Sequence, residues 1–149
     1  MFSESLGMRL RGAYLTFHRL ANTQFEACGI TADQFVVLTI LVEEPGLSQR
    51  EIVDRAHSDA NTVGAILKRL QGKRLAKRES HPSDGRVWRV FPTELGTKRQ
   101  RRASDESRGL HDQLEKLFTP KERKLLGALL SRIPPAMTGS RCGTPEEAA

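Results

Sequence analysis

Aromatic residues and long apolar runs are scarce in this chain. Phe, Tyr and Trp make up 5% of its 149 residues and hydrophobic residues 38%, which is below the usual share for a globular chain. One copy would therefore bury a modest core, which favours an oligomer whose subunits share a core. No run of 18 apolar residues is present, so no transmembrane helix is expected. The first residues also lack the apolar region of a signal peptide.

Cysteine is also rare, and its placement excludes two kinds of site. Cys28 and Cys142 are far apart in the sequence and stand in unlike contexts. A disulfide framework is therefore not expected, and a cytoplasmic location fits best. His57, His81 and His111 have no metal-ligand spacing to each other or to the cysteines, so neither a metal nor another cofactor is expected.

Catalytic patterns are missing as well. The sequence shows no nucleophile–base set, no glycine-rich phosphate loop and no paired carboxylates at a usable spacing. Helix caps and turns explain the Ser, His and Asp residues that are present. An enzyme is therefore not expected.

Positive charge is in excess, and it is concentrated in the middle of the chain. The net charge is +6. Residues 48–102 carry 14 Lys and Arg against 6 Asp and Glu, a balance of +8, whereas the remainder carries 10 against 12, a balance of −2. Such a segment indicates a polyanion partner, nucleic acid first and an anionic membrane second. A solvated basic surface is the alternative.

Helical periodicity covers most of the chain, so the fold class is mainly α. The long helix near residue 100 contains Gly96 and Gly109, which are expected to weaken it or to let it bend. The expected helices run over residues 6–28, from Thr31 to the EEPG stretch at 43–46, from Ser48 to His57-Ser58, from Ser58 or Asp59 to about Gly72, from Thr93 or Leu95 to Phe118, and from Thr119-Pro120 to Pro134-Pro135.

The basic segment has the form of a helix-turn-helix followed by a hairpin. Two short helices are joined by a tight turn near His57, and the second is the more basic. Residues 75–80 and 87–91 read as strands, and residues 87–91 are rich in β-formers. Asp84 and Gly85 between them tolerate positive φ, which predicts the turn of a small β-hairpin.

Residues 47–99 resemble the winged helix-turn-helix core of the MarR family, bacterial regulators of drug, stress and catabolic genes. The order of the helices matches that family over about residues 6–133. Pro92 stands where the family usually has leucine. The family's wing signature is Asp-x-Arg, a Val, and Leu-Thr-x-x-Gly, and it is matched at the family's spacing by Asp84, Arg86, Val90, Thr93 and Gly96.

The resemblance implies a homodimeric transcriptional regulator. It implies a repressor that binds a pseudo-palindromic operator in double-stranded DNA and is released by a small-molecule effector; no membrane partner is implied. An ordinary intrachain bundle is the alternative for the leucine-rich helices. The expected parts are an N-terminal dimerisation helix (1–30), a winged helix-turn-helix DNA-binding domain (31–96), C-terminal dimerisation helices (97–134) and a disordered tail (135–149).

The resemblance places the second short helix in the major groove, where its first residues would meet base edges. Asn61 has the amide that adenine requires, although it can instead cap the helix, and the Thr62 methyl can touch thymine. Gly64 either lets the backbone approach DNA or reflects a tolerant position. Ala65 stands where many relatives have arginine, which puts guanine readout in doubt. The candidate DNA-binding residues are Ser48, Gln49, Asp59, Ala60, Asn61, Thr62, Gly64, Ala65, Lys68, Arg86 and Arg89.

The wing supplies the strongest single candidate, Arg86, whose guanidinium can enter a narrow minor groove. Asp84 is expected to shape the wing by pairing with an arginine, as the resemblance suggests, and Arg89 to assist at the DNA backbone. Trp88 is open between packing and contact. Ser48 and Gln49 can hold a phosphate at a helix N-terminus. About half of a basic set is expected to contact phosphates: Lys68, Arg69, Lys73, Arg74, Lys77 and Arg78.

An effector site is suggested by the family, whose members often bind small aromatic acids. Tyr14, His18 and Phe35 are the candidate lining residues, with a core or surface role as the alternative for His18. Two other functions stay open. One is a winged-helix module for protein–protein interaction, and the other is an oxidant-sensing regulator that uses Cys28, although the sequence places no cation close to this residue.

Overall fold

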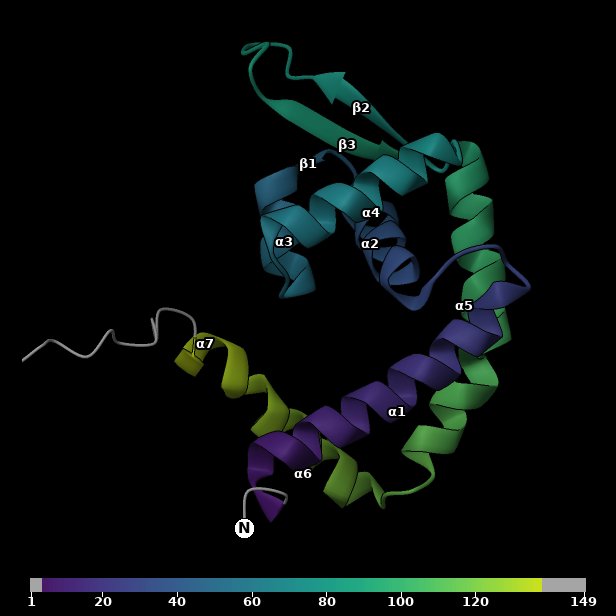
Figure 1. The fold of residues 1–149 in the computed structure, drawn as a ribbon, viewed down its shortest axis with the longest axis vertical. Coiled ribbons are helices and arrows are strands. Elements are labelled where there is room, and N and C mark those ends of the chain that lie inside the picture. Colours follow the sequence, from purple (N-terminus) through teal and green to yellow (C-terminus); the bar gives the residue numbers. More distant parts are fainter. Residues whose placement is uncertain (1–3, 138–149) are drawn as a thin grey trace, which may run out of the picture. The chain divides into compact units, whose positions relative to one another are not determined.

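The computed structural model describes residues 4–137. They divide between His111 and Asp112 into a first and a second unit. The described chain is mainly helical with a small antiparallel sheet, so the predicted fold class is confirmed (Figure 1). Its elements are α1 (Leu6–Glu26), α2 (Ala32–Glu43), β1 (Leu47–Ser48), α3 (Gln49–Ala56), α4 (Ala60–Gly72), β2 (Ala76–Ser80), β3 (Trp88–Pro92), α5 (Glu94–Glu115), α6 (Pro120–Ser131) and α7 (Ile133–Met137).

Helix starts follow the local sequence closely. Capping boxes form at Thr31, Ser48 and Thr119, where each hydroxyl accepts a hydrogen bond from the backbone three residues later. Of the two candidate caps for α4, Asp59 is the one used. These starts were predictable because a cap depends on residues within one helical turn.

The first unit holds the core. Helices α2, α3 and α4 contact one another, and β3 packs against α2. Rings of Phe25 and Phe35 stack with centroids 4.5 Å apart and join α1 to α2. The fully buried side chains of this core include Leu38, Leu41, Ile52, Leu67, Leu70, Leu75 and Val90.

The sheet contains the predicted hairpin and one strand that was missed. The strand order is β1-β3-β2, and Val90 of β3 pairs with Leu47 on one side and Arg78 on the other. Strand β1 has two residues, too few to show an alternating pattern.

The hairpin turn forms at the predicted place for a different reason. Among residues 4–137, positive φ occurs at Gly29, Gly46, His57 and Arg74, and Gly85 is not one of them. Instead the Val87 N–H donates to the Asp84 carbonyl at 3.1 Å. The expectation that positive φ makes this turn is therefore wrong.

Gly96 is required by packing. A Cβ at this position would overlap the backbone carbonyl of Leu75, so the start of α5 approaches the turn between α4 and β2 more closely than any other residue allows. The expectation of a weakened or bent helix at Gly96 is replaced by this contact. Gly109 meets nothing within 4 Å in the described structure.

Two helix ends differ from the expectations. Helix α5 ends at Glu115, earlier than the predicted Phe118. Helix α6 ends at Ser131, and Pro134 and Pro135 lie in the five-residue helix α7, so the predicted stop at this pair is wrong. Proline is tolerated in the first turn of a helix because the N–H groups there have no intrahelical partner. The predicted disordered tail thus starts inside α7; residues 138–149, with Cys142, lie outside the described residues.

Candidate nucleic-acid interface

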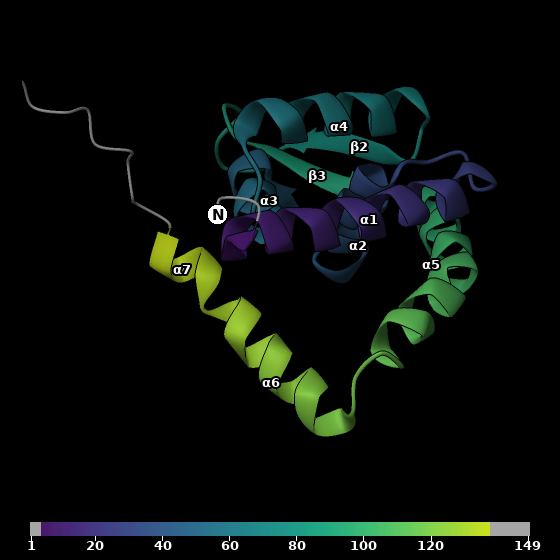
Figure 2. The ribbon, with the colours of Figure 1, turned by 60° about the horizontal axis from the view of Figure 1, so that its bottom comes forward.

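Helix α4 lies at the surface of the first unit beside the β2–β3 hairpin (Figure 2). The turn before it is sharp because His57 ends α3 in the left-handed region, at φ 49°. One face of α4 is buried, through Val63, Ile66, Leu67 and Leu70. The opposite face is exposed, and Asn61, Ala65, Lys68 and Arg69 lie on it.

The cap of α4 occupies two of the predicted base readers. Both carboxylate oxygens of Asp59 accept from Thr62, one from its N–H and one from its hydroxyl, each at 2.8 Å. These hydrogen bonds hold the pKa of Asp59 below its ordinary value. Because Asp59 is the cap, the capping alternative for Asn61 is wrong, and in residues 4–137 the Asn61 amide makes no hydrogen bond.

Gln49 connects three elements. Its Nε2 donates to the carbonyl of Ala60 at the start of α4, at 3.1 Å, and its Oε1 accepts from Arg78 of β2 at 3.3 Å. A Cβ on Gly64 would lie 3.2 Å from the same Nε2. Gly64 therefore faces Gln49, which neither interpretation of this glycine from the sequence predicted.

Ser48 shares its helix N-terminus with a carboxylate. Its N–H donates to Glu51 at 2.8 Å, and its hydroxyl accepts from the Glu51 N–H. Hydrogen bonds to the Glu51 carboxyl from the Ser48 N–H, and then from the Ser48 side chain, lower the pKa of that carboxyl. The phosphate expected at Ser48 and Gln49 stays a prediction, and the Glu51 carboxylate would lie beside it.

The wing presents Arg86 and uses its neighbours for structure. Asp84 accepts a hydrogen bond from the Arg86 N–H at 3.0 Å, and no ion pair in residues 4–137 includes Asp84. Asp84 therefore shapes the wing through a backbone N–H and not through an arginine side chain. Arg89 donates to the carbonyl of Gly46 at 2.9 Å. Trp88 is 52% exposed, so it is not part of the core.

The basic set divides into engaged and free cations. Lys73 donates to Gly29 and Gln34 at 2.7 and 2.9 Å and so ties the end of α4 to the start of α2. Lys77 pairs with Glu79. In the described part of the chain, three members of this set make no side-chain hydrogen bond or ion pair, namely Lys68, Arg69 and Arg74, and Arg86 in the wing makes none either.

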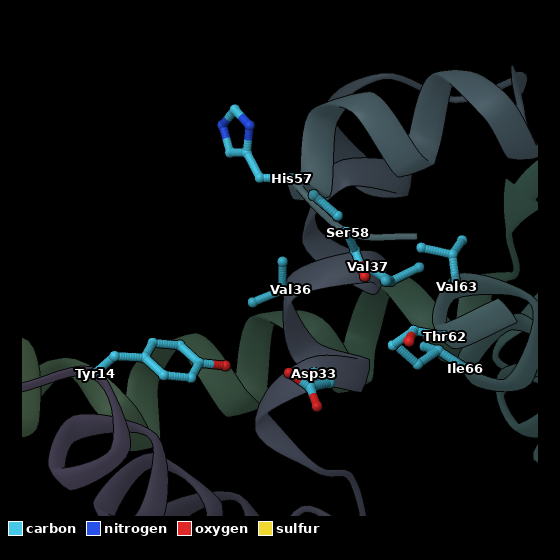
Figure 3. Close-up of a pocket in the computed structure, with 10 residues that line it drawn as sticks. Tyr14, Asp33, Val36, Val37, His57, Ser58, Thr62, Val63 and Ile66 are labelled. Carbon is cyan, nitrogen blue, oxygen red and sulfur yellow. The ribbon is translucent and has the colours of Figure 1, made fainter. Parts of the chain in front are cut away.

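A cavity of about 320 Å³ lies between α1, α2 and the α3–α4 turn. Tyr14 and Asp33 lie at one end, and Thr62, Val63 and Ile66 of α4 lie at the other (Figure 3). Burial, and then the negative charge of Asp33, raise the pKa of the Tyr14 hydroxyl. Because Thr62 lines this cavity, its position argues against the expected thymine contact.

Of the three predicted effector residues, Tyr14 alone lines the cavity. His18 stacks on Tyr14 and lies 3.9 Å from Asp33, whereas Phe35 packs on Phe25. The prediction missed the other lining residues because their apolar members have the same helical period as the core. The missed residues are Asp33, Val36, Val37, Ala56, His57, Ser58, Thr62, Val63 and Ile66.

Two further site types can be assessed within residues 4–137. No group of three or more His, Cys, Asp or Glu residues could hold a metal ion there. None of the helices described is long and apolar enough to cross a membrane. Cys28 is buried, and its carbonyl accepts from Arg99 at 2.7 Å. The architecture, a helix-turn-helix followed by a β-hairpin, defines a winged helix-turn-helix protein.

Comparisons with known proteins give the family. The model of the MarR family matches residues 29–87. The uncharacterised HTH-type transcriptional regulator YdgJ of Bacillus subtilis is 27% identical over 117 residues, which are 78% of this chain and 71% of that protein. The repressor CouR, solved bound to a 23-mer DNA duplex, is 29% identical with a TM-score of 0.80, covering 89% of this chain and 94% of CouR. BpsR of Bordetella bronchiseptica, whose DNA binding is regulated by 6-hydroxynicotinic acid, is 26% identical with a TM-score of 0.82, covering 95% of this chain and 98% of BpsR.

The chain matches the MarR family of winged helix-turn-helix transcriptional regulators over residues 29–87, and its fold is that of solved MarR-family proteins. The members of this family are regulators and not enzymes, which confirms the expectation that the chain is no enzyme.

Proposed function

We propose that this regulator is a homodimeric repressor that binds a pseudo-palindromic operator through α4 and the wing. The proposal rests on the exposed face of α4 and on the guanidinium of Arg86. Both belong to the first unit, and within the described residues the Arg86 side chain has no hydrogen-bond or ion-pair partner. CouR bound to a DNA duplex and a MarR mutant of E. coli in complex with operator DNA share the fold. A chromosomal target is consistent with the expected cytoplasmic location.

The dimer is supported by apolar surface in the second unit. Helix α6, which the structure describes in full, has no buried residue. Leu125, Leu126, Leu129 and Leu130 are each between 37% and 58% exposed. A leucine-rich helix this exposed would be unstable in water, and a second copy of the chain would cover it. Light scattering should report twice the chain mass for the native protein and a smaller mass after Leu126→Glu with Leu130→Glu.

Release by an effector is supported by the position of the cavity. Thr62, Val63 and Ile66 belong to α4, so a ligand in the cavity would touch the helix that meets DNA. BpsR, whose DNA binding is regulated by 6-hydroxynicotinic acid, and PcaV, solved with its natural ligand, are regulators of the same fold. The cavity volume suits a small aromatic acid, and Tyr14 would stack or donate to it.

A salt-dependent titration with DNA from the chain's own upstream region tests the function. Binding should weaken between about 50 and 200 mM salt with a log–log slope near −0.9 for each neutralised phosphate. Arg86→Ala should cost about 1–3 kcal/mol of binding free energy. Arg108→Ala, which removes the same charge from α5, is the matched control. No mobility shift at low salt would contradict the proposal and favour a module for protein–protein interaction.

The oxidant-sensing alternative needs an accessible thiolate. Cys28 has 2% of its surface exposed, so a peroxide cannot reach it without local opening of the fold. Release by a ligand in the cavity is therefore the better supported mechanism.

A further inference from the structure

The first two turns of α4 leave few groups for base readout. Asp59 and the Thr62 hydroxyl are bonded to each other, and Thr62 lines the cavity. Val63 is buried, and Gly64 faces the Gln49 amide. The Thr62 hydroxyl donates to Asp59, and Val63 and Gly64 have no polar side chain, so none of these residues offers an unpaired side-chain donor to a base edge.

Before Lys68, the exposed face of α4 offers one side-chain amide without a partner and the methyl groups of two alanines. Asn61 has an exposed side chain whose oxygen and nitrogen make no hydrogen bond within the described residues. Ala60 and Ala65 are exposed and offer only a methyl group each. An amide pairs bidentately with adenine N6 and N7, and a methyl group packs against the C5 methyl of thymine.

We propose that the base pairs beneath the first two turns of α4 are A·T pairs, with Asn61 bound to an adenine and Ala65 packed on a thymine methyl. This inference rests on the proposed DNA-binding function and adds the identity of the bases. Thr62, the thymine contact expected from sequence, is replaced in this role by Ala65, because Ala65 lies one turn after Asn61 on the same exposed face.

Guanine has no reader at this end of the helix. Arginine or lysine bound to guanine O6 and N7 is the commonest specific contact, and residues 60–67 contain neither. The first cation of α4 is Lys68, about 10 Å along the helix axis from Asn61. The nearby guanidinium of Arg78 is held by Gln49. Arg86 in the wing favours the narrow minor groove of A-tracts, so both contact surfaces select A·T pairs.

Selection from a pool of random duplexes with the full-length protein gives the first test. Half-sites with consecutive A·T pairs at a fixed position support the inference. Half-sites with G·C pairs there overturn the inference and leave the proposed function standing. Recovery of no preferred sequence overturns both.

Base analogues in the selected duplex give the second test. Asn61→Ala should weaken binding about 5- to 150-fold for loss of the full bidentate pairing, and 7-deazaadenine, which lacks only N7, should weaken it by part of that factor. The two changes together should cost little more than Asn61→Ala alone. Lys68→Ala is the matched control. Its loss of binding free energy should add to the loss caused by the analogue, because Lys68 does not contact this adenine. Full additivity for Asn61→Ala would overturn the assignment of Asn61.

Uracil in place of thymine removes only the C5 methyl group. It should weaken binding about fourfold for each thymine methyl that the protein packs against, and Ala65→Gly should make the protein insensitive to this change. Ala65→Arg should shift the selected base at its position from A·T towards G·C. Equal sensitivity of the native protein and Ala65→Gly to uracil would overturn the packing of Ala65 on thymine.

Discussion

Gly64 of α4 faces the side-chain amide of Gln49, and a Cβ at position 64 would lie 3.2 Å from Gln49 Nε2. That nitrogen donates to the Ala60 carbonyl, and the oxygen of the same amide accepts from Arg78. The glycine thus makes room for a bridge between α3, the start of α4 and β2. The bridge fixes the start of α4, the helix proposed to contact DNA, relative to the wing.

Gly64→Ala should therefore weaken DNA binding while leaving the fold intact. Alanine improves helix propensity by about 1 kcal/mol, but its Cβ displaces the flexible Gln49 side chain and its hydrogen bonds. We expect a 2- to 10-fold loss of affinity, about the worth of one hydrogen bond, measured by fluorescence anisotropy with a labelled operator duplex. In a Gln49→Ala background the same substitution should cost nothing. An equal loss in both backgrounds would rule out the bridge.

Arg74→Gly should stabilise the protein. Arg74 has φ 58°, and its N–H bonds the Gln71 carbonyl while the Leu75 N–H bonds Leu70, which is the Schellman pattern that usually holds glycine. Removing the strain of the left-handed conformation should raise the free energy of unfolding by about 1–2 kcal/mol. The greater freedom of glycine in the unfolded chain should lower it by about 0.4–1 kcal/mol. Urea unfolding should give a larger free energy of unfolding for Arg74→Gly than for the native protein. Arg74→Ala is the control, and a rise of equal size in it would contradict the backbone explanation.

Gly96→Ala should destabilise the protein, because its Cβ would overlap the Leu75 carbonyl. Overpacking of this kind costs about 1–3 kcal/mol, and a backbone neighbour cannot move aside as a side chain can. Gly109→Ala on the same helix meets nothing within 4 Å in the described structure and should be neutral or stabilising. Thermal unfolding of the two variants tests the contrast, which would be refuted by equal melting temperatures.

Asp59 should make the start of α4 sensitive to acid. Its folded pKa is lowered below the ordinary 3.8 by hydrogen bonds from Thr62, so its stabilising effect is present above that value and is lost as pH falls through the folded pKa. Carboxyl NMR titration should place the Asp59 pKa below that of an unstructured aspartate. Thr62→Val removes the hydroxyl donor and should raise the pKa, and an unchanged value would contradict the assigned cause.

Local signals and distant contacts explain which features were predictable. The caps at Thr31, Ser48 and Thr119 and the order of helices depend on near neighbours or on periodicity, and the structure confirms them. The partner of Gly64 lies fifteen residues earlier in the chain and that of Gly96 twenty-one residues earlier, so no local pattern shows either contact.

The candidate site was predictable in part for the same reason. The exposed position of Asn61, Lys68 and Arg86 follows from helix period and from the hairpin tip. The engagement of Arg89 with Gly46 and the turn of Thr62 toward the cavity depend on how separate elements pack. Residue type alone could not separate the cations that hold the fold from those free to meet DNA.

Trp88, the sole tryptophan, lies two residues after Arg86 in the wing and provides the most direct measurement of the central claim. Its emission can be followed while the full-length protein is titrated with duplex DNA from its own upstream region. We predict a saturable change in Trp88 emission whose midpoint moves to much higher DNA concentration as salt increases from about 50 to 200 mM. Emission that stays constant at low salt, together with no mobility shift of the same duplex, would contradict the claim that α4 and the wing bind DNA.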